Sequence, residues 1–445
     1  MPRMKKGTKK PVAARPGDSV RSKKEQVSRL LGTKDVSSQD YKYWNSLTNK
    51  LTEIANIYGF NRWETPILES VSLYKKYPKT EEMYNFATGR GDKIALRPDL
   101  THGLIRSYLE QENINNQPFK AFAFGPVFRQ EQKFQTGSYR QFTQFNFEIF
   151  DEAKPIAEAF LIAIVYNLFK ELQINVQIQI NSVGTLECQK EYLNKLSKYY
   201  KEASRKKKFC PECKKNMLKN PIALLLCEEP ACREARAEAP QIASFLSEES
   251  NNFFTRVLEY LDELGVNYSF DPFLIKRANY YTDTIFEVWP VNDNNEIEGK
   301  LSLGRGGRYN NLIEQLGGIS IPAIGFSGGL ERTIMKLKEK DLIFKKDDNI
   351  IFIAQVSDTA RLRAMSLFGE LYHAGYKVRQ SFTTDDLREQ LEEAKRVDAK
   401  IILILGKKEV STETILFRDV EMGVQEVITQ KGLQDRLHKR FNTKE

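Results

Sequence analysis

A run of alternating polar and apolar residues, QFTQFNFEIF, contains the first side chains that could do chemistry. Side chains of a strand alternate between the two faces of a sheet, so Gln144, Asn146 and Glu148 lie on one face and Phe145 and Phe147 on the other. The polar face ends in a carboxylate that could accept hydrogen bonds from a ligand. Taken alone, the pattern favours solvent exposure of this face, because antiparallel sheets are commonly half-solvated.

Two arginines flank the polar loop that precedes this strand. The preceding segment ends in FGPVFRQE, which contains Arg129 and Glu131, and the chain returns from the loop at Arg140. Two guanidinium groups at one hairpin could hold phosphate oxygens, because each presents a planar fork of N–H donors. A connection of this length between two strands is often functional.

Two further segments place chemical groups beside a predicted helix. In ALRPDLTHGLIR, Asp99 and Thr101 lie at a strand-to-helix turn, where each could cap the helix or bind the ammonium group of a ligand. In IGFSGGLER, the glycines are predicted to open a helix and to permit close approach of a nucleotide. Glycine-rich turns are frequent, so this segment alone is weak evidence. The residues of interest there are Gly325, Gly328, Gly329 and Arg332.

Four of the five cysteines form two close pairs, Cys210-x2-Cys213 and Cys227-x4-Cys232. Four thiolates in two close pairs suit a tetrahedral Zn²⁺ ion, whereas disulfides are not expected in a reducing cytoplasm. The alternative is a set of reduced thiols without a ligand. The same segment carries many cations over residues 205–215, so contact with RNA is a further hypothesis.

The elements that must position these residues are of three kinds. An amphipathic helix over residues 44–58 ends at Gly59. Two long antiparallel strands, Lys120–Arg129 and Gln141–Asp151, enclose the polar loop. From Ile350 onward strands and helices alternate, which predicts a small α/β domain with a mainly parallel sheet. Other predictions are strands at Val176–Ser182, Ala278–Trp289 and Gly299–Leu303, helices at Leu100–Glu110 and Pro155–Leu172, and a largely helical segment at Leu186–Leu264.

Length and charge limit the class of protein. A chain of 445 residues predicts two to four domains. No apolar run approaches the length of a membrane span, and the basic N-terminus has no apolar core of a signal peptide, so we expect a cytoplasmic protein. The net charge of +9 is compatible with nucleic acid but does not show it. Residues 1–30 resemble a disordered basic arm.

Taken in order, these segments resemble the class II aminoacyl-tRNA synthetases. YGFNRWETPILE is similar to motif 1 of that class, with Pro66 at its proline, FRQE and the loop and strand after it to motif 2, and GFSGGLER to motif 3. LRPDLT, YRQFTQFNFEIF, GRGGRYNNLIEQLGG and the closing FRDVEMGVQEVI resemble the histidyl-tRNA synthetase family in particular. The resemblance covers residues 31–429.

The resemblance implies a histidine–tRNA ligase that works in two steps. The carboxylate of histidine attacks the α-phosphorus of ATP, and the terminal ribose of tRNA(His) then takes the histidyl group. Because the first step brings two anions together, fixed cations and Mg²⁺ must stabilise its transition state. The resemblance assigns Arg129 to the α-phosphate, Arg332 to the γ-phosphate end and Glu131 to adenine. Arg140, Gly328 and Gly329 complete the expected ATP site.

The same resemblance implies a histidine pocket. Asp99 and Thr101 match the family residues near the ammonium group, and Gln144 lies by the amino acid. Glu148 is expected at the imidazole, together with the pair Tyr280 and Tyr281. The alternation of the strand places Gln144 and Glu148 on one face independently of the resemblance. A buried carboxylate–imidazole pair would reject amino acids of similar size.

One stretch departs from the family pattern. The family usually has Arg-Gly-Leu-Asp-Tyr-Tyr, but this chain reads KRANYY. Counted back from Tyr280 without a gap, Lys276 stands at the position of the catalytic arginine, and it keeps the charge but loses the bidentate fork. Arg277 could serve instead if the strand bulges by one residue. GSYR also replaces the usual Gly-Arg-Tyr-Arg, which removes one cation from the loop.

The sequence therefore predicts an α+β class II catalytic domain, with an antiparallel sheet flanked by helices, a helical insertion domain and a C-terminal α/β anticodon-binding domain. Motif 1 forms a dimer interface in this class, so a homodimer is expected. The alternatives are a regulatory subunit of ATP phosphoribosyltransferase, a synthetase for another amino acid, and a histidine or tRNA sensor that forms no adenylate. The predicted bounds are 1–30 (arm), 31–185 and 265–342 (catalytic), 186–264 (insertion) and 348–435 (anticodon-binding).

Overall fold

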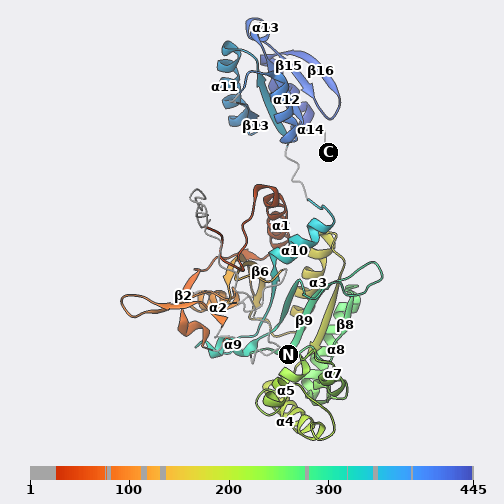
Figure 1. Cartoon of the computed structure of the whole chain (residues 1–445). Helices are drawn as coiled ribbons and strands as arrows, with labels where there is room; N and C mark the ends of the chain where they lie inside the picture. Colours follow the sequence, from red (N-terminus) through yellow and green to blue (C-terminus); the bar gives the residue numbers. More distant parts are fainter. Residues whose placement is uncertain are drawn as a thin grey trace, which may run out of the picture. The chain divides into compact units, whose positions relative to one another are not determined.

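A computed structural model gives the structure of the chain. It describes residues 27–75, 77, 82–111, 118–130, 137–275, 280–317, 319–343, 349–381 and 384–442. The chain divides into two compact units, Met1–Ile343 and Phe344–Glu445 (Figure 1). Each unit has its own sheet and its own buried core.

A large, mostly antiparallel sheet forms the centre of the first unit. In spatial order its strands are β1 (Asn61–Arg62), β5 (Phe119–Phe128), β6 (Gln141–Phe150), β11 (Ala323–Gly329), β10 (Gly304–Arg308), β9 (Thr282–Pro290), β7 (Val176–Ser182) and β8 (Tyr268–Phe270). Neighbours from β5 to β7 pair antiparallel, whereas the edge strands β1 and β8 pair in parallel. The predicted hairpin of two long strands is confirmed as β5 and β6.

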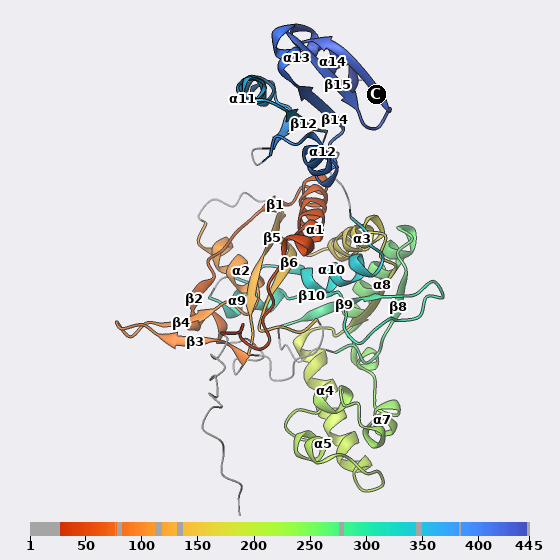
Figure 2. The same cartoon turned by 45° about the horizontal axis from the view of Figure 1, so that its top comes forward.

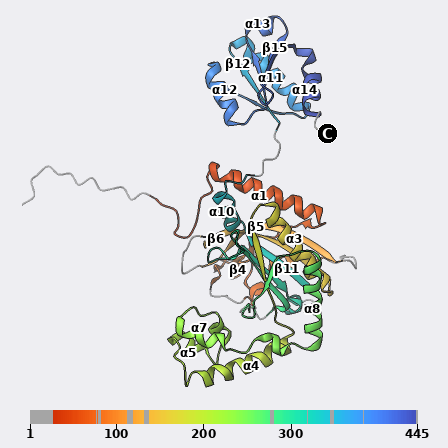
Figure 3. The same ribbon diagram turned by 90° about the vertical axis from the view of Figure 1, so that its right-hand side faces the viewer.

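Helices cover both faces of this sheet. They are α1 (Ser38–Ile57), α2 (Thr101–Leu109), α3 (Ile156–Glu171), α8 (Glu248–Glu263), α9 (Asn310–Gln315) and α10 (Leu330–Glu339). Helices α2 and α9 pack on the face of β5 that carries Ala121 and Ala123. Helix α3 packs against β7 and β11, α10 against β6, and α8 lies beside α3 (Figure 3). The amphipathic helix predicted over residues 44–58 is confirmed as α1, which buries Leu47, Leu51 and Ile54.

Two smaller parts belong to the same unit (Figure 2). One is an antiparallel sheet with the strands β2 (Leu68–Ser70), β4 (Lys93–Leu96) and β3 (Asn85–Ala87) in spatial order. The short helix η1 (Val71–Tyr74) directly follows β2 in the sequence. The other is the predicted helical segment. Its helices are α4 (Leu186–Ala203), α5 (Pro211–Asn216), α6 (Ile222–Leu225), α7 (Pro230–Ala237) and η3 (Ile242–Phe245). Their core also includes Leu274, Ile275 and Ile285, so it is continuous with the large sheet.

Two predictions near the end of this unit are wrong. The strand predicted at Gly299–Leu303 begins only at Gly304, and residues 299–301 and 303 form bends. The helix predicted near Gly325 begins at Leu330, and the glycine run before it forms strand β11. Glycine was interpreted as a helix-opening turn, but here Gly325 and Gly328 leave room for the side chains of Glu148 and Phe145 on the neighbouring strand β6.

The second unit is a five-stranded sheet between helices. In spatial order its strands are β13 (Lys377–Gln380), β12 (Ile350–Gln355), β14 (Ile401–Leu405), β15 (Thr414–Asp419) and β16 (Val424–Thr429). Helices α11 (Asp358–His373) and α14 (Leu433–Asn442) cover one face, and α12 (Leu387–Arg396) covers the other. The short helices α13 (Lys407–Ser411) and η4 (Gln430–Gly432) complete the unit.

The expectation of a mainly parallel sheet in this unit is half right. Strands β13, β12 and β14 are parallel, whereas β15 and β16 pair antiparallel. A short turn joins β15 to β16, and parallel neighbours would need a crossover connection of a dozen residues or more. In the described part of the chain, no helix is both long and apolar enough to cross a bilayer.

Candidate active site

A cavity of about 840 Å³ opens on the large sheet of the first unit. Its walls come from segments far apart in the sequence: the β5–β6 hairpin, strands β9 and β10, the β11–α10 junction, and residues 225–236 of the helical segment. The cavity therefore lies where the sheet, its long hairpin and the helical segment meet, and it collects most of the residues predicted to do chemistry.

Five of the predicted histidine-binding residues line this cavity: Asp99, Thr101, Gln144, Tyr280 and Tyr281. The rings of the two tyrosines lie 4.7 Å apart, and burial raises the pKa of Tyr281 to about 12, so its hydroxyl stays protonated at neutral pH. The Oε1 atom of Gln144 is buried and has no hydrogen-bond partner among the described residues. An unpaired buried carbonyl facing a cavity is suited to a ligand's N–H group.

Glu148 lies one layer beneath these residues, and it is absent from the described residues that line the cavity. Thr101 Oγ1 and Asn146 Nδ2 donate to its Oε1 over 2.8 Å, and the hydroxyl of Tyr309 donates to its Oε2. Burial raises the pKa of Glu148 to about 7, although these three donors favour the anion.

The expectation that the polar face of this strand meets solvent is wrong. Glu148 is 1% exposed and Asn146 is 0% exposed, while Phe145 and Phe147 on the other face are buried as well. The alternation itself is confirmed, because Asn146 donates to Glu148 on one face and the rings of Phe145 and Phe147 are in contact on the other. Helices α2 and α9 cover the polar face, and the sequence pattern of a single strand cannot predict such a cover.

Strand β11 has glycine residues opposite Glu148 and Phe145 of the neighbouring strand β6. Gly325 pairs with Glu148, and a Cβ atom placed on Gly325 would lie 1.5 Å from Glu148 Oε2. A Cβ on Gly328 would lie 2.2 Å from Cζ of Phe145. Both contacts are far inside van der Waals distance, so each position excludes a side chain. Gly328 and Gly329 also line the cavity.

Two of the predicted phosphate-binding arginines reach the cavity. The Nε atom of Arg129 donates to the carbonyl of Pro98 over 3.0 Å, and its guanidinium lies 5.0 Å from the ring centre of Phe142. Arg332 donates to the carbonyls of Gly137 and Ser302 over 3.1 and 2.9 Å. Both side chains line the cavity and are held by backbone acceptors, so their charge is fixed in place.

Other predicted residues fall outside the cavity or outside the description. Arg140 is not among the described residues that line the cavity, although its carbonyl accepts the N–H of Arg129 over 2.9 Å. Glu131, Lys276 and Arg277 lie outside the described residues. The four paired cysteines come together in the helical segment, with all four sulfur atoms within 4.8 Å of one another.

Several residues of the site were not singled out from the sequence. They include His102, which contacts Asp99, Tyr309, which contacts Glu148, and Glu331, whose carboxylate accepts the N–H of Thr143. Burial raises the pKa of Glu331 to about 7. His102 lies three residues after Asp99, and this spacing on a helix start is the signal that could have found it.

Comparisons with known proteins agree over nearly the whole chain. A family model described as histidyl-tRNA synthetase matches residues 32–333. The chain is 33% identical to a histidine–tRNA ligase of Natranaerobius thermophilus over 91% of this chain and 97% of that protein. It is 34% identical to one of Staphylococcus aureus (strain JH9) over 90% of this chain and 97% of that protein.

Solved structures agree as well. The apo histidyl-tRNA synthetase of S. aureus aligns with a TM-score of 0.76 and 31% identity, covering 92% of this chain and 99% of that one. A structure from Bacillus halodurans C, titled as an ATP phosphoribosyltransferase regulatory subunit/histidyl-tRNA synthetase, has 19% identity and a TM-score of 0.59 over 85% of this chain and 98% of that one, which shows a shared fold only. The ligase interpretation is therefore favoured over the regulatory-subunit alternative, and the chain belongs to the histidyl-tRNA synthetase family.

Proposed function

We propose that this chain activates histidine with ATP in the 840 Å³ cavity and transfers the histidyl group to the 3′ end of tRNA(His). The observation that carries the proposal is the composition of that one cavity. It joins two fixed guanidinium groups, Arg129 and Arg332, to an amino-acid end with Asp99, Gln144 and a tyrosine pair. An adenylation reaction needs both ends, because the carboxylate and the α-phosphate must be held in contact.

The amino-acid end fits histidine. Asp99 supplies the anion for the α-ammonium group, and the unpaired Oε1 of Gln144 accepts one of its N–H bonds. We assign Thr101 and the tyrosine pair to the wall around the imidazole. Glu148 acts on the imidazole end through the hydroxyls of Thr101 and Tyr309, which it orients, or by direct contact if ligand binding opens the layer above it.

The phosphate end fits ATP. We assign Arg129 to the α-phosphate, where it offsets the charge of the attacking carboxylate and the pentavalent transition state, and Arg332 to the γ-phosphate. Gly328 and Gly329 leave room for the nucleotide, and Glu131 is proposed for adenine. Arg140 is proposed to act from the loop, since its described position is outside the cavity wall.

The cavity also suits Mg²⁺, which members of this family use with ATP. Glu287 and Glu331 line it, and their carboxylates are the hard oxygen ligands that Mg²⁺ prefers. When bound, Mg²⁺ neutralises charge on the phosphates and stabilises the departing pyrophosphate.

Other parts of the proposal concern the whole molecule. Residues 31–185 and 265–342 are proposed as the catalytic domain, 186–264 as the insertion and 348–435 as the anticodon-binding domain. Helix α8 packs against α3 and β9, so the insertion ends on the catalytic sheet. A homodimer is proposed through motif 1, where Ile67 and Leu68 are exposed. The cytoplasmic location and the role of the basic arm stay predictions.

Histidine-dependent exchange of labelled pyrophosphate into ATP tests the proposal. Exchange with histidine and with no other amino acid is expected, followed by charging of tRNA(His) in the same preparation. Folded protein that binds histidine but supports no exchange would contradict the adenylation step and favour a sensor. Light scattering at micromolar concentration tests the homodimer separately from the adenylation activity, so a negative result in one experiment does not affect the other.

A further inference from the structure

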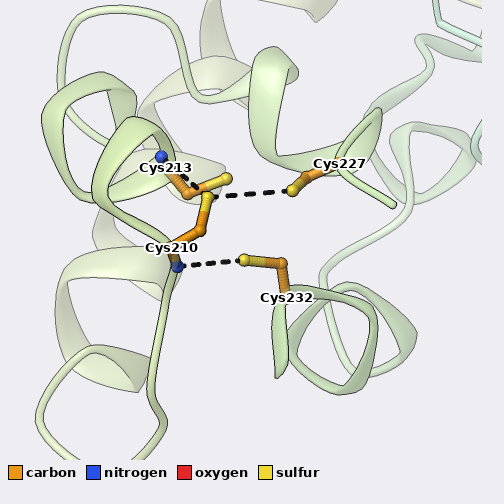
Figure 4. A group of neighbouring side chains, drawn as sticks. All are labelled: Cys210, Cys213, Cys227 and Cys232. Carbon is orange, nitrogen blue, oxygen red and sulfur yellow. Dashed lines mark hydrogen bonds between the residues drawn. The ribbon is translucent and has the colours of Figure 1, made fainter. Parts of the chain in front are cut away.

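Four cysteines of the helical segment converge on one point, and we refer to Cys210, Cys213, Cys227 and Cys232 as the cysteine cluster. All four sulfur atoms lie within 4.8 Å of one another, and the side chains point toward a common centre (Figure 4). The sulfurs of Cys210 and Cys227 are 3.9 Å apart, well beyond the roughly 2.05 Å of a disulfide. At a Zn–S distance of about 2.3 Å, a tetrahedral site separates its sulfurs by about 3.8 Å.

The surroundings of the cluster match those of a metal-bound thiolate set. The backbone N–H of Cys213 donates to the sulfur of Cys210, and the N–H of Cys210 donates to the sulfur of Cys232, each over 3.4 Å. N–H···S bonds of this kind orient ligand sulfurs and stabilise their charge. Cys213 and Cys232 are buried and the other two are half-buried. Four protein thiolates would complete a tetrahedral coordination and leave no open position for a substrate. The geometry is that of a closed, structural site.

The charge of the neighbouring residues is also suitable. Zn²⁺ with four thiolates carries a net charge of about −2. The segments on either side of the first pair are strongly basic, with Lys206, Lys207, Lys208, Lys214 and Lys215. Glu228 lies within the second pair and Arg233 directly after it, and the two form an ion pair with each other.

The fold of the helical segment would be stabilised by such a cross-link. Helices α5, α6 and α7 have 6, 4 and 8 residues, and helices this short are not stable in isolation. Cys213 and Cys232 are themselves part of the core that holds these helices together. Small cores of this kind are commonly completed by a structural metal.

The cluster also lies directly behind one wall of the cavity. Cys227 stands between Leu226 and Glu228, and both of these residues line the cavity. Arg236, on the same helix as Cys232, donates to the carbonyl of Leu225 over 3.1 Å and lies 3.5 Å from Glu228. We propose that the cysteine cluster binds one structural Zn²⁺ ion that fixes this wall, residues 225–236, against the catalytic sheet.

Metal analysis of the purified full-length chain tests the site without reference to activity. About one zinc ion per chain is expected, with the four cluster thiols protected from a thiol reagent until a chelator removes the metal. Replacement of zinc by Co²⁺ should give the absorption bands of a tetrahedral thiolate complex. Iron in place of zinc, or four freely reactive thiols with no metal, would overturn the proposal.

Two variants separate the metal site from a general effect of losing a cysteine. Cys227→Ser removes a half-buried cluster ligand, and its zinc content after chelator challenge should fall at least tenfold. The matched control is Cys188→Ser, since Cys188 contacts Thr185 and Ser247 outside the cluster. The control should keep its zinc. Equal zinc in both variants would overturn the assignment of Cys227.

Trypsin gives a readout of the structural role. Removal of zinc should make the basic stretch at residues 205–219 a preferred cleavage site, as judged by mass spectrometry of the first fragments. Unchanged resistance in zinc-free, folded protein would contradict the cross-link. The role of the wall in catalysis rests on the proposed function, and pyrophosphate exchange by Cys227→Ser measures that role separately. A raised KM for the substrates is expected. Unaltered KM and kcat would show that the ion stabilises the helical segment without affecting the cavity.

Discussion

The imidazole of His102 and the carboxylate of Asp99 form a buried pair at the amino-acid end of the cavity. The Nδ1 atom of the ring lies 3.0 Å from Oδ1 and 3.1 Å from Oδ2, and the backbone N–H of His102 donates to Oδ1 over 3.1 Å. Burial opposes the charge on Asp99, but the contacts with His102 outweigh it and hold the pKa of this carboxyl below its usual value.

His102 is therefore expected to position Asp99, the carboxylate that we propose binds the α-ammonium group. His102→Ala should raise the KM for histidine about tenfold in pyrophosphate exchange, because one charge-assisted hydrogen bond is worth about 1.5 kcal/mol. The kcat and the KM for ATP should change much less. His102→Asn retains a donor and should recover part of the affinity.

His373, an exposed residue of helix α11, provides the control for removal of a histidine. His373→Ala should leave both constants unchanged. A His102→Ala protein with normal KM for histidine would contradict the positioning role, even if its thermal stability had fallen.

The raised pKa of Glu148 predicts how stability depends on pH. The folded pKa of about 7 exceeds the ordinary value of 4.5, so this group favours the folded state below about pH 4.5 and loses that contribution as pH rises to 7. Relative to Glu148→Gln, the wild type should lose about 3 kcal/mol of unfolding free energy over this range. Urea unfolding at several pH values measures the difference.

Glutamine is the informative substitution at this position. Alanine would leave three donors unpaired in a buried layer, whereas the amide of glutamine can meet both Thr101 and Tyr309. We expect the Glu148→Gln protein to fold. Its preference for histidine over other amino acids in pyrophosphate exchange should fall at least tenfold. A pH-independent stability difference between the two proteins would show that the carboxyl is not perturbed.

Arg332 should act in the transition state. Arg332→Ala is expected to lower the rate of pyrophosphate exchange about 10²–10³-fold, as for removal of other fixed charge donors. Arg332→Lys keeps the charge but not the two contacts to Gly137 and Ser302, so it should be intermediate. Arg256→Ala, an exposed arginine paired with Glu259, is the matched control and should have normal kinetics.

The departure KRANYY gives a direct test of which cation replaces the family arginine. Lys276→Ala is expected to lower kcat for adenylation more than Arg277→Ala, because Lys276 stands at the ungapped position. Single-turnover formation of adenylate measures this step alone. The reverse order would assign the role to Arg277, and two unimpaired variants would show that neither side chain contacts the phosphate.

The sequence predicted those features that depend on local periodicity. The alternation along β6 placed Gln144 and Glu148 on one face, and the spacing of the cysteines predicted a four-sulfur cluster; the structure confirms the first geometry and brings the four sulfurs together. Both predictions concern residues whose relation is fixed by a single element or by two close pairs.

Features that depend on what covers an element were missed. Burial of the polar row follows from α2 and α9, which come from distant parts of the chain. The glycines of β11 were interpreted as a helix start because their close approach to Phe145 and Glu148 exists only once the strands are paired. Tyr309 lies in a quoted motif, but its contact with Glu148 spans 161 positions.

Gly325 has a consequence for any survey of mutational tolerance. A methyl group there would overlap the carboxylate of Glu148, so a substitution should displace Glu148 from its hydrogen bonds and damage the site. In a saturation scan scored by growth, Gly325 would thus rank with Arg129 and Arg332, although it presents no reactive atom. Intolerance at this position reports the space that the Glu148 side chain occupies over the neighbouring strand, and only a paired measurement of folding and of adenylation distinguishes it from chemistry.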